Sequence, residues 1–113
     1  MRFTDVETIA RASFPDVEFA VALEVTKAMG RHSFLSFKGK ITHAGRKDIA
    51  VSWILCENDT VVPPAVQKKY VETIEEESGW KVDLHLLPSG HIPNLSMPDK
   101  LAEMLLKIVG MEA

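Results

Sequence analysis

Two short apolar runs, separated by a segment with helical periodicity, most strongly constrain what this 113-residue chain can form. The first run, residues 50–56, is rich in Val, Ile, Leu and Trp, and the second, residues 81–87, alternates apolar and polar side chains. Between them, residues 65–78 carry apolar side chains at helical spacing. A strand, a helix and a second strand in this order favour a βαβ unit with two parallel strands.

Each predicted strand is followed at once by a side chain that can take part in proton transfer. Asp59 comes after the first strand, and His91 comes after the second. Because the residues just past the carboxyl ends of parallel strands meet at one edge of the sheet, Asp59 and His91 should lie close together. Glu57 is the alternative acid, but it lies where the first strand ends.

The sequences around these two residues resemble two loops of the α/β-hydrolases. The run CENDTVVP, residues 56–63, is similar to the loop that carries the catalytic acid of that family. The run SGHIPNLSMP, residues 89–98, is similar to the histidine loop of small esterase-like members. The order of acid before histidine is also that of the family. We therefore expect the chain to be related to the α/β-hydrolases.

The resemblance implies an α/β fold that corresponds to the C-terminal portion of an α/β-hydrolase. It extends over about residues 32–109 and is weaker over residues 14–31, which look like the end of a cap helix. Residues 1–49 are accordingly expected to form a helical cap remnant and a connection. Residues 50–113 are expected to form a parallel strand-helix-strand-helix unit of the hydrolase core.

The resemblance also implies roles for the two residues. His91 would take the proton from a serine nucleophile and return it to the leaving group, while Asp59 would hold the imidazole tautomer and stabilise the imidazolium. The substrate would be a small carboxylic ester or similar acyl compound, and no cofactor is implied because acyl transfer through serine needs none.

The nucleophile motif of the family, G-x-S-x-G, is not found in the sequence. None of the six glycines frames a serine in that pattern. The chain is therefore expected to be a truncated form that is inactive alone and needs a longer or complementing polypeptide. A serine site rebuilt within the chain is a less favoured alternative, and the serines available for it are Ser33, Ser36, Ser52, Ser89 and Ser96. Two further alternatives are a non-catalytic remnant that binds a partner or small apolar ligand, and an unrelated small module in which Asp59 and His91 are structural.

Composition excludes several other classes of function. The net charge is −3 and the basic residues are scattered, which argues against nucleic-acid binding. No apolar run approaches 18 residues and the first residues lack the apolar segment of a signal peptide, so we expect no membrane span and a cytoplasmic location. Cys56 is the only cysteine and is expected to be buried. No His, Cys or Asp spacing matches a metal site, so none is predicted.

Three further helices are predicted around the βαβ unit. One spans residues 4–13 with a Thr4 capping box, and one spans residues 17–29 with Asp16 as its N-cap. The last begins after Ser96, which resembles an N-cap, and ends at Gly110. Two strands make a poor sheet by themselves, so marginal stability and self-association through an exposed sheet edge are also predicted.

Overall fold

A computed structural model describes residues 5–30 and 33–111 of the chain. The elements in order are helices α1 (Val6–Ser13) and α2 (Phe19–Ala28), the short 3₁₀ turns η1 (Phe34–Phe37) and η2 (Gly45–Lys47), strand β1 (Ser52–Cys56), helix α3 (Pro64–Ser78), strand β2 (Asp83–Leu87), and helices α4 (Pro93–Ser96) and α5 (Pro98–Ile108). The fold is mixed α/β. None of the helices in this described part has the length and apolar character that crossing a membrane requires.

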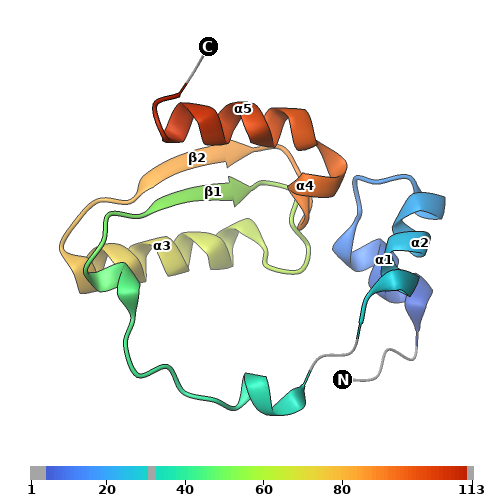
Figure 1. Cartoon of the computed structure of the whole chain (residues 1–113), viewed down its shortest axis with the longest axis horizontal. Coiled ribbons are helices and arrows are strands. Elements are labelled where there is room, and N and C mark those ends of the chain that lie inside the picture. Colours follow the sequence, from blue (N-terminus) through green and yellow to red (C-terminus); the bar gives the residue numbers. More distant parts are fainter. Residues whose placement is uncertain (1–4, 31–32, 112–113) are drawn as a thin grey trace.

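The predicted βαβ unit is confirmed. Strands β1 and β2 pair in parallel, with Ser52 opposite Asp83 and Cys56 opposite Leu87. Figure 1 shows the strands running between α3 and α5, with both carboxyl ends at the side where α4 lies. The two-stranded sheet places the loops that carry the candidate site residues next to each other.

The crossover helix α3 begins and ends as the sequence predicts. Pro64 occupies its first turn, where the missing N–H of proline costs no helical hydrogen bond. Gly79 ends it with a φ of +78°, a left-handed conformation that glycine adopts without strain. The face of α3 that packs inward carries Val71 and Ile74, both buried.

The N-terminal helices differ from the prediction at their starts. The side chain of Asp5 caps α1 by accepting a hydrogen bond from the Thr8 backbone N–H at 3.1 Å, while the predicted cap Thr4 lies outside the described residues. Asp16 is not the N-cap of α2, which begins only at Phe19. Its carboxylate instead accepts a hydrogen bond from a distant loop, so a tertiary contact has replaced the local one.

The start of the last helix also corrects the prediction. Ser96 is not the N-cap of α5, because it ends the short helix α4 and its hydroxyl donates to the carbonyl of Ile92 at 3.4 Å. Met97, with a φ of −148°, precedes α5 instead. A residue before proline is pushed into an extended conformation, and Pro98 therefore separates the two helices. Gly110 follows α5 with a φ of +72°, as expected for a C-terminal glycine.

Helix α5 covers β2 only in part. None of its residues is buried, and it leaves a cleft of about 840 Å³ against β2. Leu84 and Leu86 of β2 and Leu106 of α5 line this cleft and remain partly exposed. A substantial apolar surface is thus uncovered beside the sheet.

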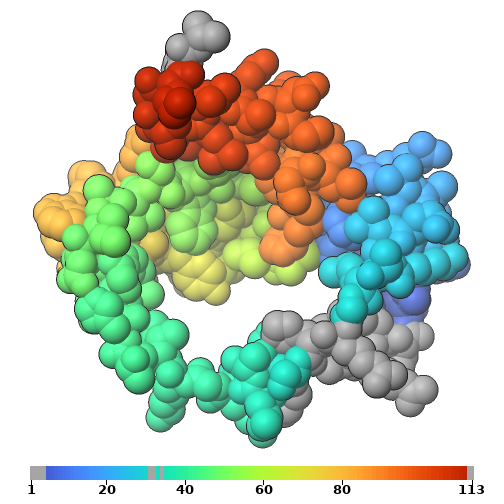
Figure 2. All heavy atoms as spheres, in the orientation of Figure 1, coloured from blue at the N-terminus to red at the C-terminus, as the bar shows by residue number. Residues whose placement is uncertain are grey.

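The segment of residues 33–51, which precedes β1, takes a long path outside the rest of the molecule (Figure 1). It contains η1 and η2, and Figure 2 shows an open space between it and the body formed by the sheet and helices. Near its end, the guanidinium of Arg46 donates two hydrogen bonds to Glu77 of α3, at 2.9 and 3.1 Å. That contact returns the chain to the βαβ unit just before β1.

Candidate active site

The loops after β1 and β2 are joined directly through their backbones. The N–H of Glu57 donates to the carbonyl of Leu87 at 2.9 Å, and the N–H of Asn58 donates to the carbonyl of Ser89 at 3.0 Å. The parallel pairing therefore continues past the ends of the strands. It holds the residues that follow, Asp59 and His91, on the same side of the sheet edge.

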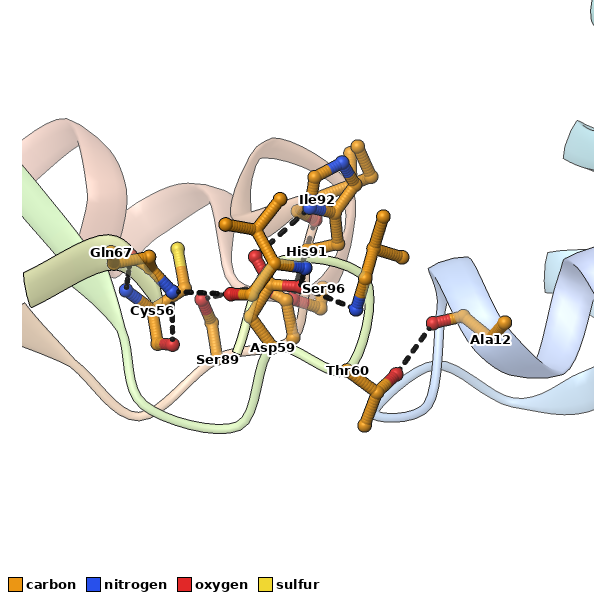
Figure 3. Close-up of polar contacts among 12 residues, drawn as sticks. Ala12, Cys56, Asp59, Thr60, Gln67, Ser89, His91, Ile92 and Ser96 are labelled. Carbon is orange, nitrogen blue, oxygen red and sulfur yellow. Dashed lines mark hydrogen bonds and ion pairs between the residues drawn. The ribbon is translucent and has the colours of Figure 1, made fainter. Parts of the chain in front are cut away.

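The structure brings Asp59 and His91 into contact. Nδ1 of His91 lies 2.9 Å from Oδ2 of Asp59 (Figure 3). The Asp59 side chain is 5% exposed and that of His91 is 33% exposed, so the carboxylate is buried while part of the ring reaches solvent. With Nδ1 as the donor, the lone pair lies on Nε2, and Nε2 has no hydrogen-bond partner among the described residues. The alternative acid, Glu57, is exposed and its side chain makes no such contact.

The second oxygen of Asp59 is held by its own loop. Oδ1 accepts hydrogen bonds from the backbone N–H groups of Val61 and Val62, both at 2.9 Å. Burial raises the pKa of Asp59, but the hydrogen bonds from His91 and from these two N–H groups outweigh it. The pKa therefore lies below its ordinary value of 3.8, and the carboxylate is ionised at neutral pH.

A buried glutamine of α3 holds both ends of the Asp59 loop, and the sequence did not single it out. Oε1 of Gln67 accepts from the N–H of Cys56 at 3.1 Å, and Nε2 donates to the carbonyls of Cys56 and Val62 at 3.0 and 2.9 Å. Its position gives a signal that could have revealed it. Gln67 lies four residues before Val71 and seven before Ile74, so it is a polar residue on the buried face of the helix.

The N-terminal helices contact both loops. Oγ1 of Thr60, next to Asp59, donates to the carbonyl of Ala12 at 2.8 Å. The N–H of Gly90, next to His91, donates to Oδ2 of Asp16, also at 2.8 Å. An apolar cluster of α1 and α2 packs against the segment after His91; it consists of Ala10, Phe14 and Ala22, with Ile92 and Leu95 against them.

The serines closest to His91 in sequence are engaged elsewhere. The hydroxyl of Ser89 is fully buried and donates to the carbonyl of Gly90 at 3.0 Å, and that of Ser96 donates to Ile92. Within the described part of the chain, no serine hydroxyl is hydrogen-bonded to His91. Among the residues that the structure describes, no three His, Cys, Asp or Glu side chains lie close enough together to bind a metal ion.

A second aspartate–histidine pair lies within β2. Nε2 of His85 is 2.8 Å from Oδ2 of Asp83, and the hydroxyl of Ser52 donates to the same oxygen at 3.1 Å. The serine here contacts the aspartate rather than the imidazole. Proton transfer from a serine requires the hydroxyl to be hydrogen-bonded to the imidazole, which in turn contacts the acid. This pair is a useful comparison for Asp59 and His91.

Comparison with known proteins agrees with the resemblance of the loops. No protein-family model matches the chain. Over 107 residues, 95% of its length, the chain is 39% identical to a protein named probable hydrolase R7 from Phoma sp.. Over 106 residues it is 24% identical to the alpha/beta hydrolase nvfD of Aspergillus novofumigatus. It spans 44% and 41% of the lengths of these two proteins. The chain is therefore a relative of the α/β-hydrolases.

Proposed function

We propose that this chain provides the acid and the histidine of a Ser–Asp–His triad that hydrolyses a small carboxylic ester or related acyl compound. The observation that carries the proposal is the hydrogen bond between Nδ1 of His91 and the buried carboxylate of Asp59. This bond fixes the tautomer in which Nε2, at the partly exposed side of the ring, can accept a proton.

In the proposed reaction, a serine hydroxyl within hydrogen-bonding distance of Nε2 attacks the acyl carbon while its proton passes to His91. The imidazolium that forms is stabilised by the ionised Asp59. His91 then gives the proton to the departing alkoxide, which leaves as an alcohol. In the second half, a water molecule attacks the acyl-serine, His91 takes the water proton, and the same proton returns to the serine as the carboxylic acid is released.

The serine of this proposal comes from outside the 113 residues, in a longer or complementing polypeptide. The absence of a G-x-S-x-G motif from the sequence supports this part of the proposal. The other engagements of Ser89 and Ser96 support it as well. The chain alone is accordingly inactive.

A chimera tests the proposal. The matched segment of the probable hydrolase R7 is replaced by this chain, and the purified protein is treated with a fluorophosphonate probe and assayed with a short-chain aryl ester. We expect probe labelling and ester hydrolysis, with His91→Ala reducing the hydrolysis rate by on the order of 10⁶-fold. Asp59→Asn should reduce it by about 10³- to 10⁴-fold, because the imidazole tautomer is no longer fixed.

His85→Ala is the matched control, since it also removes an imidazole bonded to an aspartate. A folded chimera that hydrolyses the ester equally well with and without His91 would show that the proposed role is wrong. A chimera that folds but is inactive with every variant would contradict the hydrolase assignment. The unfused chain is labelled separately, and labelling of one of its serines would show that the nucleophile lies within the chain.

A further inference from the structure

We propose that Gln67 is a positioning residue for the Asp59–His91 pair, an inference that rests on the function proposed above. Its side-chain amide joins the two ends of the loop that carries Asp59. One end is Cys56, the last residue of β1, and the other is Val62, just before α3. Asp59 lies between these two anchored points in the sequence, and Figure 3 shows the amide of Gln67 beside Cys56.

A continuous series of hydrogen bonds runs from Gln67 to the imidazole. Nε2 of Gln67 donates to the carbonyl of Val62 at 2.9 Å. The N–H of the same Val62 donates to Oδ1 of Asp59 at 2.9 Å. The other oxygen of Asp59 lies 2.9 Å from Nδ1 of His91. Displacement of Val62 would therefore move the carboxylate that orients His91.

The amide has one orientation in which all of its hydrogen-bonding groups are satisfied. Both hydrogens of Nε2 are donated to backbone carbonyls, and Oε1 accepts from the N–H of Cys56 and, at 3.3 Å, from Nε1 of Trp53. Gln67 is 4% exposed, so no solvent replaces a lost partner. A buried polar group that loses its partner carries a desolvation cost, which makes this arrangement rigid.

Gln67 also occupies the position of a neighbouring strand. Alternate residues of a strand direct their backbone groups to opposite sides, and Glu57 faces β2. Cys56 consequently directs its N–H and C=O away from β2, and the glutamine amide pairs with both. The helix that follows the Asp59 loop thus fixes the strand that precedes it.

Nuclear magnetic resonance of the unfused chain tests the inference without any assay of activity. Two signals are followed: the Nδ1–H proton of His91, which is sheltered from exchange by its hydrogen bond, and the carboxyl carbon of Asp59 through an acid titration. Gln67→Leu removes all of the amide contacts. Gln67→Glu keeps the length and an acceptor oxygen, but its ionised carboxylate cannot donate to the two carbonyls.

In both variants we expect the Nδ1–H signal to be lost to solvent exchange and the pKa of Asp59 to rise, because its carboxylate is no longer held against its hydrogen-bond donors. Thr73→Ala is the matched control, because Thr73 lies on the exposed face of α3 and its hydroxyl donates only to the carbonyl of Lys69. The control should retain both wild-type signals. A general loss of stability would not change these signals in molecules that remain folded.

Two results would overturn the inference. One is a folded Gln67 variant with an unchanged Nδ1–H signal and an unchanged Asp59 titration. The other is loss of the folded spectrum in both variants, because Gln67 would then be required for folding rather than for positioning. Neither result bears on hydrolysis, which is decided by the chimera. Conversely, an inactive chimera would not contradict a measured effect of the Gln67 variants on Asp59 and His91. It would show that this effect has no role in ester hydrolysis.

Discussion

The carboxylate of Asp16 accepts a hydrogen bond from the backbone N–H of Gly90 at 2.8 Å, although 74 residues separate them in the chain. Gly90 directly precedes His91, so the segment between α1 and α2 is attached to the loop that carries the imidazole. The approach is close because glycine has no side chain. A Cβ at residue 90 would lie 2.5 Å from Oδ1 of Asp16 and 3.0 Å from the ring of Pro15.

Gly90→Ala should therefore destabilise the protein. The added methyl group has to displace Pro15 and Asp16, and crowding of this kind costs about 1–3 kcal/mol. We expect the free energy of unfolding, measured by urea denaturation, to fall by about 1 kcal/mol or more. Gly45→Ala is the control, because a Cβ at that position meets nothing within 4 Å. Equal stabilities of the two variants would contradict the close packing of Pro15 on Gly90.

The depressed pKa of Asp59 predicts a specific dependence of stability on pH. A carboxyl group whose pKa is lower in the folded than in the unfolded state stabilises the fold above its unfolded pKa, and this stabilisation is lost as the pH falls through the folded value. The difference in unfolding free energy between the wild type and Asp59→Asn should shrink as the pH falls through 3.8 and below. Urea denaturation from neutral pH to about pH 3 measures it. A difference that stays constant over this range would contradict the predicted ionisation of Asp59.

The exposed connection predicts where a protease will cut first. Leu35 is 74% exposed and Phe37 is 64% exposed, on a short 3₁₀ turn outside the body of the molecule. We expect chymotrypsin to cleave native protein at these residues before Tyr70, which is 51% exposed but lies within α3. Mass spectrometry of early digestion products identifies the sites. Early cleavage at Tyr70 would mean that α3 opens as readily as the connection.

The edge of β1 predicts self-association of the isolated chain. Ser52 and Ile54 direct their backbone groups to the same side as Cys56, away from β2, and there the described residues include no further strand. We expect sedimentation velocity to show association that increases with protein concentration. Ser52→Pro removes one N–H from this edge and should weaken association by about fivefold, the effect of a hydrogen bond of about 1 kcal/mol.

Ser52→Ala is the control for that variant, since it removes the hydroxyl bonded to Asp83 while keeping the N–H. It should associate like the wild type. A wild-type sample that remains strictly monomeric and melts cooperatively would show that two strands, with the helices around them, are a sufficient sheet here.

The parts of the fold and site that could be predicted from the sequence are those determined by local patterns. Apolar runs and helical spacing predicted the βαβ unit, and the ends of parallel strands predicted that Asp59 and His91 would meet. Gly79 ends a helix for a reason that depends only on its own backbone conformation. In each case the pattern behind the prediction lies within a few neighbouring residues or within one strand-helix-strand unit.

The parts that could not be predicted depend on contacts between distant segments. Asp16 and Ser96 have side chains that commonly cap helices, and both were wrongly predicted to do so. Asp16 instead bonds the loop of His91, and Ser96 ends a short helix that Pro98 separates from α5. The helical spacing could have marked Gln67 as a buried polar residue, but not its partners, because Cys56 and Val62 become neighbours only after the loop has closed.

Helices α1 and α2 contact the loops that carry Asp59 and His91, and a long connection joins them to β1 (Figure 1). Their binding depends on an effective concentration, which the length and stiffness of the tether determine, as well as on the contacts themselves. The contacts that hold them run from Ala12 and Asp16 to Thr60 and Gly90. A change in the length of this connection would therefore change how firmly the two helices hold the loops of Asp59 and His91, even if every contact stayed the same.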